Sequence, residues 1–296
     1  MSRIEGACNR SPRPCTRALA DYTTVMNVRS LRSILHVISI MLVAVIPALA
    51  VEVVDLPVTI DGRTFTGRLA LPSTPGKHPA VLVVHEWWGL NAYAEQRARE
   101  LADLGYVALA ADVYGEAASN DFPTAVARSK SFYTQPALFT ARLSPALAAL
   151  RARPEVDGKR VAAIGFCFGG AAVLQLARGG ADLLAVIAFH PGLGTSAPAA
   201  KDAVKAKVVV CHGGADPFVP VTDVTAFTQE MLAANAAWEF HSYPGAVHAF
   251  TNPTAGQGVT NVPPTVPFSQ AVRYDANAEA ASMVVMRRTL AEVFTR

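Results

Sequence analysis

The feature that most limits the possible folds is an alternation, from residue 51 onward, of short apolar runs with longer amphipathic stretches. Runs such as AVLVVH, VAAIGF and KVVVCH are apolar almost without interruption, which is typical of strands buried on both faces of a parallel sheet. Between them lie stretches with the spacing of amphipathic helices. The alternation predicts an α/β fold with a doubly wound, mostly parallel sheet and helices on both of its faces.

The expected elements can be placed along the chain. Strands are expected at 51–56, 63–71, 80–85, 106–111, 160–166, 183–189, 206–212 and 238–243, and helices at 93–104, 144–153, 168–178, 221–234 and 277–294. The first two strands follow each other without a helix, so we expect them to form an antiparallel edge hairpin. In the second helix, Ser144 before Pro145 is interpreted as an N-cap with proline at the first helical position.

Two stretches have no regular pattern, 115–121 and 251–272, and the second is rich in Pro, Gly, Asn and Thr. A loop of about twenty residues inside a domain is usually functional or disordered. No internal repeat and no second zone of composition divides residues 51–296, which are therefore expected to form one domain.

The first fifty residues differ from the rest in charge and hydropathy. They hold six arginines and two acidic residues, and an apolar run at 34–46 is followed by Pro47-Ala48-Leu49-Ala50. A basic region, a short apolar region and an A-x-A site make up a secretory signal, and the run is shorter than the roughly 20 residues that span a membrane. We expect cleavage after Ala50, with Met26 as an alternative start, and an exported, periplasmic or secreted protein without stable membrane insertion. An uncleaved N-terminal anchor helix is the alternative.

Residues 51–296 carry 20 basic and 21 acidic side chains, so this part of the chain is nearly neutral. That balance argues against a nucleic-acid partner, which needs clustered lysine and arginine. Its two cysteines, Cys167 and Cys211, each lie near a predicted strand end beside glycine, which argues against a disulfide between them. No metal is expected, because neither a His-Glu-x-x-His nor a paired Cys-x-x-Cys spacing occurs.

Cys167 lies in the most informative motif, Gly165-Phe166-Cys167-Phe168-Gly169-Gly170, where a predicted strand runs directly into a predicted helix. The motif matches a nucleophile elbow with cysteine in place of serine. Small residues are needed two positions before and after the nucleophile, because the turn is strained and its backbone passes close to its neighbours. The helix N-terminus favours the thiolate. A buried cysteine in an ordinary glycine-rich turn is the alternative interpretation.

Asp216 and His248 each follow the carboxyl end of a later predicted strand. The chain order of nucleophile, acid and histidine is that of an α/β-hydrolase, whose active site lies at this edge of the sheet. His248 can take the thiol proton while Asp216 fixes the histidine tautomer, so we expect a catalytic triad with Cys167. Taken singly, Asp216 could be a helix cap and His248 a turn residue. Supporting or loop roles are expected for His85, His190 and His212.

These motifs resemble those of the dienelactone hydrolase family. The resemblance rests on 85–91, 105–114, 165–170, 213–220 and 245–250, and it extends over roughly residues 55–295. It implies an eight-stranded α/β-hydrolase fold without a large cap domain. It also implies a Cys-His-Asp triad at Cys167, His248 and Asp216.

The resemblance gives Glu86 a role as well. In the family, a glutamate at this position pairs with the resting thiol and helps to generate the thiolate when substrate enters. The alternative interpretation of Glu86 is an acidic loop residue exposed to solvent. The backbone N–H groups of Trp87 and Phe168 are expected to form the oxyanion hole, one from the loop after the third strand and one from the residue after the nucleophile.

Substrate recognition is where the sequence departs from the family pattern. Dienelactone hydrolases proper hold the substrate carboxylate with arginines, one of them four residues after the histidine, where this chain has the uncharged Asn252. Arg128 or Lys130 is the candidate for the position of a second family arginine. An apolar pocket mouth is suggested instead by Trp87, Trp88 and Phe168.

The sequence thus predicts a hydrolase of small-molecule carboxylic esters or lactones that needs no cofactor. Cys167 would attack the carbonyl, and water activated by His248 would hydrolyse the resulting thioester. Two alternatives are a thioesterase or peptidase on the same fold, and a non-catalytic binding or redox protein with Cys167 as a sensor thiol. The pattern points to no particular oligomeric state.

Overall fold

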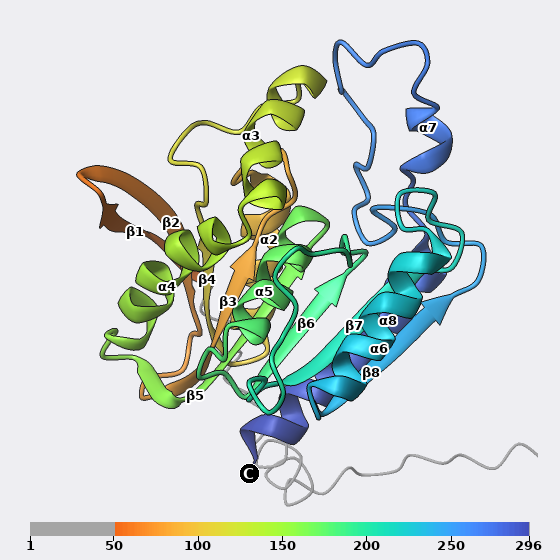
Figure 1. Cartoon of the computed structure of the whole chain (residues 1–296). Coiled ribbons are helices and arrows are strands. Elements are labelled where there is room, and N and C mark those ends of the chain that lie inside the picture. The colour runs from red at the N-terminus through yellow and green to blue at the C-terminus, as the bar shows by residue number, and fades with distance from the viewer. Residues whose placement is uncertain (1–50, 296) are drawn as a thin grey trace, which may run out of the picture. The chain divides into compact units, whose positions relative to one another are not determined.

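The computed structural model describes residues 51–295, whose strands pair in one eight-stranded sheet in the order β1-β2-β4-β3-β5-β6-β7-β8 (Figure 1). The predicted signal and its cleavage site lie outside the described residues. The strands are β1 Glu52–Ile60, β2 Arg63–Leu71, β3 His78–Val84, β4 Val107–Ala111, β5 Val156–Phe166, β6 Ala185–Phe189, β7 Lys207–Gly213 and β8 Trp238–Tyr243.

The sheet is antiparallel only at one edge. β1 pairs with β2 along its whole length, and β2 pairs with β4, both in the antiparallel sense, which confirms the predicted edge hairpin. All remaining pairs, from β4 through β8, are parallel. Every residue of β4 and β6 is buried, which explains why these strands are apolar without alternation.

Helices cover both faces of the sheet, and their apolar side chains form two core clusters. The helices are α2 Ala92–Asp103, α3 Phe122–Thr134, α4 Ala137–Arg151, α5 Phe168–Arg178, α6 Val221–Ala233, α7 Phe268–Ala271 and α8 Ala276–Phe294. One cluster includes side chains of α4, α5 and α6, and the other includes side chains of α2 and α8. The doubly wound α/β fold is therefore confirmed. Among the described residues, no helix is both long and apolar enough to cross a membrane.

Two helix predictions were wrong or incomplete. The helix predicted from Ser144 begins at Ala137, so Pro145 lies inside α4 and Ser144 caps nothing. The buried side chains of Phe139 and Leu143 carry the apolar stripe of α4 two turns further back, which outweighs the hydrogen bond that the proline removes. The sequence also did not predict α3, in which only three side chains are buried and the apolar stripe is correspondingly weak.

The 251–272 segment contributes no strand to the sheet, and α7 is its only helix. It is tied to the N-terminus of α3, where the N–H of Phe122 donates to the carbonyl of Thr260 (3.0 Å) and the N–H of Thr260 donates to that of Asn120 (3.0 Å). In Figure 1 α3 and the loop that carries α7 stand at the same end of the molecule, beyond the carboxyl ends of the parallel strands.

Candidate active site

The turn between β5 and α5 has the strained geometry that the glycine-rich motif predicts. Cys167 is the single residue between the two elements, and its backbone lies at φ 54° and ψ −115°. A positive φ is costly for a residue with a side chain and is retained only where the surroundings enforce it. Here the N–H of Cys167 donates to the carbonyl of Phe189 on β6 (2.9 Å), which anchors the turn.

The flanking glycines are required by close backbone packing. A Cβ added to Gly165 would overlap the carbonyl oxygen of Gly169, and one added to Gly169 would overlap the carbonyl oxygen of Val84 on β3. A Cβ on Gly170 would lie 2.9 Å from the Pro191 side chain. The first turn of α5 is thus pressed against the ends of β3 and β6, and this packing aims Cys167 outward from the edge of the sheet.

Cys167, His248 and Asp216 lie in one hydrogen-bonded line. His248 follows β8, and its Nε2 lies 3.0 Å from the Cys167 Sγ. Its Nδ1–H donates to Oδ2 of Asp216, which follows β7 (2.7 Å). The other Asp216 oxygen accepts from the N–H of Phe218 (2.9 Å), so the carboxylate is held on both sides. The three side chains predicted at the ends of separate strands are therefore brought together.

The electrostatics of this line favour a charged His248. Burial alone lowers the pKa of His248, but the neighbouring Cys167 sulfur and the Asp216 carboxylate outweigh burial and hold that pKa well above 6.5. The imidazole Nε2 lies within hydrogen-bond distance of the Cys167 sulfur, so His248 can exchange a proton with it. The arrangement can therefore hold a nucleophilic sulfur beside a proton carrier.

The backbone around His248 is fixed by hydrogen bonds to the chain after α7. The N–H of His248 donates to the carbonyl of Ala271 (3.1 Å), and the carbonyl of His248 accepts from the N–H of Arg273 (3.1 Å). The phenyl ring of Phe218 meets the imidazole edge-on, with 5.2 Å between ring centroids. These contacts limit the freedom of the imidazole between Asp216 and Cys167.

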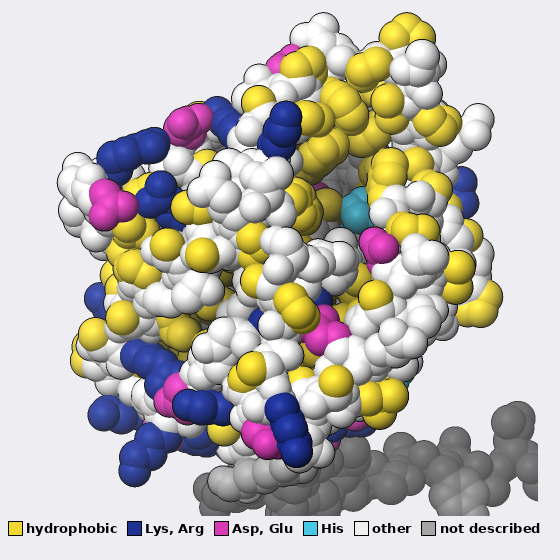
Figure 2. Space-filling model, in the orientation of Figure 1, with side chains coloured by type: hydrophobic (Ala, Val, Ile, Leu, Met, Phe, Trp, Pro, Cys, Tyr) yellow, Lys and Arg dark blue, Asp and Glu magenta, His cyan; other side chains and the backbone are white. Residues whose placement is uncertain are grey.

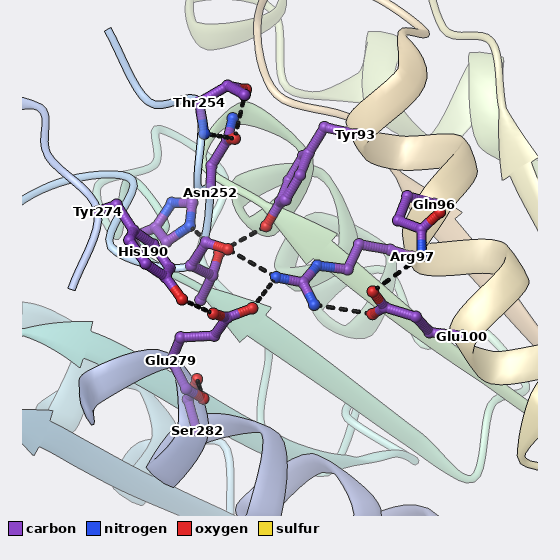
Figure 3. A network of polar contacts seen from close by, with 11 residues as sticks. Tyr93, Gln96, Arg97, Glu100, His190, Asn252, Thr254, Tyr274, Glu279 and Ser282 are labelled. Carbon is purple, nitrogen blue, oxygen red and sulfur yellow. Dashed lines mark hydrogen bonds and ion pairs between the residues drawn. The ribbon is translucent and has the colours of Figure 1, made fainter. Parts of the chain in front are cut away.

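A buried polar network lies behind His248 and was not predicted from the sequence (Figure 3). The Thr251 hydroxyl lies 2.7 Å from the Tyr93 hydroxyl and 2.8 Å from His190 Nε2. The His190 ring is in edge contact with the His248 ring, at 5.3 Å between centroids. Burial and the nearby His248 keep the pKa of His190 well below 6.5, so His190 stays neutral beside a charged His248. The supporting role expected for His190 fits this position.

Arg97 of α2 joins this network to the helices beneath it. Its guanidinium donates to the carbonyl of Thr251 (2.6 Å) and to Glu100 (2.8 Å), and it also pairs with Glu279 of α8. The Arg97 side chain is only 8% exposed. The network thus connects the loop that carries His248 to helices on one face of the sheet, through residues whose sequence spacing gives no local signal.

Glu86 is buried at the carboxyl end of β3, but the structure places Asn252 beside it instead of the thiol. The Asn252 Nδ2 donates to Glu86 Oε2 (2.7 Å), while Glu86 Oε1 has no hydrogen-bond partner. The orientation of the amide is fixed because Asn252 Oδ1 accepts from the N–H and the hydroxyl of Thr254 (both 2.9 Å). Burial raises the pKa of Glu86, although the hydrogen bond from Asn252 opposes part of that rise.

His85 fixes the loop that contains Glu86 and Trp87. Its Nδ1–H donates to the carbonyl of Glu86 (2.6 Å), and its Nε2 accepts from the N–H of Val113 (3.2 Å). The predicted oxyanion donors lie where the motif put them in the chain: Trp87 in this loop, and Phe168 as the first residue of α5. The N–H of a first helical residue has no acceptor within its own helix.

A cleft of about 1020 Å³ opens above Cys167 and His248, between α3 and the 251–272 segment. Figure 2 shows a hollow on this side of the molecule with hydrophobic side chains gathered around it. Trp87 and Trp88 line the cleft, as expected for an apolar mouth. Phe168 does not, because its side chain is fully buried in the core against Phe132 and Phe139. That part of the prediction was wrong.

The two candidate cations lie in different surroundings. Arg128 does not line the cleft, because its guanidinium donates to the carbonyl of Ala117 (2.9 Å) and pairs with Glu116 (2.8 Å). Lys130 lines the cleft at its exposed margin. Asn252 also lines the cleft, although its amide is engaged by Glu86 and Thr254.

The remaining cysteine lies away from the cleft. Cys211 on β7 is fully buried, and both it and Cys167 are free. Burial raises the pKa of the Cys211 thiol to about 12, although the Tyr243 hydroxyl at 3.6 Å opposes part of that rise. Within residues 51–295, no group of three or more His, Cys, Asp or Glu side chains is arranged to hold a metal ion.

Comparison with known proteins places these features in a family. The family model described as the dienelactone hydrolase family matches residues 65–294. A dienelactone hydrolase-like promiscuous phosphotriesterase from metagenomic libraries superposes with a TM-score of 0.75 at 38% identity, over 82% of this chain and 99% of that one. The carboxymethylenebutenolidase of Pseudomonas putida is 30% identical over 199 residues, which are 64% of this chain and 82% of that enzyme.

Proposed function

Because this chain belongs to the dienelactone hydrolase family and is thus a hydrolase of carboxylic esters or lactones, we propose that it acts through Cys167, His248 and Asp216. The substrate is a small molecule, and the reaction passes through a thioester acyl-enzyme. The observation that carries this proposal is the line from the Cys167 sulfur through His248 to the buried Asp216, at a strained turn that opens into a large cleft.

The reaction follows from that geometry. The Cys167 sulfur attacks the ester carbonyl, so that a C–S bond forms while negative charge develops on the carbonyl oxygen. The N–H groups of Trp87 and Phe168 stabilise that oxygen. As the C–O bond breaks, the imidazolium of His248 gives its proton to the leaving alcohol. Water then attacks the thioester and gives a proton to His248, and the C–S bond breaks to release the acid and restore the thiolate.

The proposal is tested by replacing the nucleophile. Cys167→Ala should lower the hydrolysis of a p-nitrophenyl ester by about a thousandfold or more, because the covalent path is lost. A far-ultraviolet circular dichroism spectrum matching that of the wild type controls for folding. The thioester itself should be seen as the mass of one acyl group on the peptide containing Cys167 after acid quenching. Cys167→Ala activity within about tenfold of wild type would falsify the assignment.

The same site also favours a second candidate activity, the hydrolysis of uncharged phosphotriesters. The similarity to a phosphotriesterase extends over 99% of that chain, and the cleft has room for a phosphorus centre with three substituents. Attack of sulfur on phosphorus would expel the aryl alcohol, and water would then cleave the P–S bond. Release of p-nitrophenol from paraoxon by the wild type but not by Cys167→Ala would support this activity, and equal rates would exclude it.

Three rival functions can be distinguished by comparing oxygen esters, acyl-thiols and anilides of the same acid. A thioesterase would prefer acyl-thiols to oxygen esters of the same acid, and a peptidase would cleave the matching anilides. A sensor thiol would become oxidised or alkylated without releasing any alcohol from an ester. The order p-nitrophenyl ester, then acyl-thiol, then anilide in kcat/KM supports the ester hydrolase.

We also propose that the protein is exported, on the layout of its first fifty residues alone. The mature protein should then begin at Val51. Its intact mass, measured after expression with the full sequence in a bacterial host, checks this. A mature protein that retains residues 26–50 would contradict it.

A further inference from the structure

Four aromatic side chains on one wall of the cleft form a closed ring of edge-to-face contacts, which we call the aromatic square. Its members are Trp87, Trp88, Phe268 and Phe122. The ring centroids are 5.0 Å apart for Trp87 and Trp88, 6.3 Å for Trp88 and Phe268, 5.8 Å for Phe268 and Phe122, and 5.4 Å for Phe122 and Trp87. The interplanar angles are 62–89°, so neighbouring rings meet edge to face.

The square is built from three separate parts of the chain, and it lines the same cleft as Cys167 and His248. Trp87 and Trp88 belong to the loop after β3, Phe122 begins α3, and Phe268 begins α7. Trp87 directly follows Glu86 and supplies one of the proposed oxyanion donors. Trp87, Trp88 and Phe122 are only partly buried, so a molecule in the cleft would still remove aromatic surface from water.

The rest of the cleft continues this apolar character. Small apolar side chains of the 251–272 segment extend the wall around the square, among them Ala255, Val259 and Val266. On other parts of the lining, Val126, Tyr133 and Phe218 are 39%, 42% and 47% exposed. Large apolar side chains that gather at a concave surface mark a place that a ligand covers.

The charges of the cleft do not suit an anionic group. Among the described residues that line it, Lys130 is the one lysine or arginine. Its ammonium group is exposed, so solvent screens its attraction for an anion. One N–H of the Asn252 amide donates to Glu86, and the amide is uncharged, so it supplies no positive charge for a carboxylate. Glu86 at the base of the cleft is an acidic side chain and offers no positive charge to a substrate carboxylate.

We infer that the aromatic square is a binding subsite for an uncharged aryl or branched alkyl group of the ester, next to its carbonyl. This inference rests on the proposed ester hydrolase function and specifies its substrate class. The substrate would be a neutral ester with a bulky apolar acyl group, because the square offers area for burial, while Lys130, the one cation among the described lining residues, is exposed to solvent.

The first test compares two esters with the same leaving group, p-nitrophenyl acetate and p-nitrophenyl phenylacetate. Trp88→Ala should lower kcat/KM for the phenylacetate about 10- to 100-fold and leave the acetate within about threefold, because only the larger acyl group reaches the square. Trp238→Ala is the matched control, since Trp238 is partly buried on β8 and does not line the cleft. It should change both esters equally.

The second test measures the discrimination against charge. We expect kcat/KM for p-nitrophenyl hexanoate to exceed that for the mono-p-nitrophenyl ester of adipic acid by about tenfold or more, and Lys130→Gln to leave this ratio nearly unchanged. A preference for the acidic ester that disappears in Lys130→Gln would overturn the inference. So would an equal loss on acetate and phenylacetate in Trp88→Ala. Neither outcome affects the proposed function, which fails only if Cys167→Ala retains activity.

Discussion

Replacing Thr251 with valine tests the buried network behind His248 without making a cavity. Thr251 is fully buried, and its hydroxyl contacts the Tyr93 hydroxyl at 2.7 Å and His190 Nε2 at 2.8 Å. Valine has nearly the same shape as threonine, so the packing is kept while both polar contacts are lost. The hydrogen bond from Arg97 to the Thr251 carbonyl involves the backbone and is retained.

The size of the effect follows from the groups left without partners. A buried polar group that loses its hydrogen bond costs about 1–3 kcal/mol. His190 Nε2 is left in that state, while the Tyr93 hydroxyl keeps its interaction with the Arg97 guanidinium, so Thr251→Val should cost about 1–3 kcal/mol. His190 Nδ1 also has no hydrogen-bond partner, so without the Thr251 hydroxyl neither ring nitrogen of His190 would be hydrogen-bonded. A loss in this range is a large part of the roughly 5–15 kcal/mol by which a native domain is stable.

The chain offers a matched control in Thr289 of α8. Thr289 is also fully buried, but its hydroxyl has no hydrogen-bond partner. Thr289→Val should therefore change the free energy of unfolding by less than about 1 kcal/mol, or raise it, because no partner is left behind. Thr251→Ser keeps the hydroxyl and should recover most of the stability that Thr251→Val loses.

The assay is urea unfolding followed by circular dichroism, with the free energy of unfolding extrapolated to water for all four proteins. The expected order of stability places Thr251→Val clearly below Thr289→Val and Thr251→Ser. If Thr251→Val and Thr289→Val unfold at the same urea concentration with the same slope, the network contributes nothing to stability and the reasoning is refuted.

Three further predictions concern packing, reactivity and pH. Gly169→Ala should prevent folding, because its Cβ would overlap a backbone carbonyl of β3, and soluble yield and thermal melting check this. Iodoacetamide near neutral pH should alkylate Cys167 and not the buried Cys211, as peptide masses will show; modification of Cys211 first would contradict the burial argument. Glu239 has its pKa lowered from 4.5 to about 2, chiefly by its hydrogen bond with Lys207. Because the folded pKa lies below the unfolded one, this contribution to stability is present above pH 4.5 and is lost as the pH falls toward 2. The stability difference between wild type and Glu239→Gln should shrink over that range, and a constant difference in unfolding free energy would count against it.

The inner strands of the sheet could be predicted because they are buried on both faces and are therefore apolar without alternation. Strands β2 and β8 and helix α5 begin and end at the predicted residues. The start of α4 could not be predicted in the same way. There, Ser144 and Pro145 predict a helix start, but the apolar side chains that pack in the core extend back to Phe139, and the helix begins before them.

Some residues of the site could also be predicted from local sequence, and others could not. Cys167, Asp216 and His248 could be named in advance because each follows a strand end, and parallel strands bring their carboxyl ends to one edge. The contact of Asn252 with Glu86 joins residues 166 positions apart, and the aromatic square joins three segments of the chain. Nothing in local spacing predicts which distant side chains meet, since that depends on how the connecting loops pack.

The 251–272 segment also affects how this enzyme can change over evolution. It provides much of one wall of the cleft, yet it contributes no strand to the sheet and lies outside the two large core clusters. Substitutions at its small apolar positions, such as Ala255, Val259 and Val266, can reshape the cleft while the sheet and the triad stay in place. Selection in the laboratory or in nature can therefore alter substrate range here with little loss of stability, which makes this segment the first choice for a mutant library.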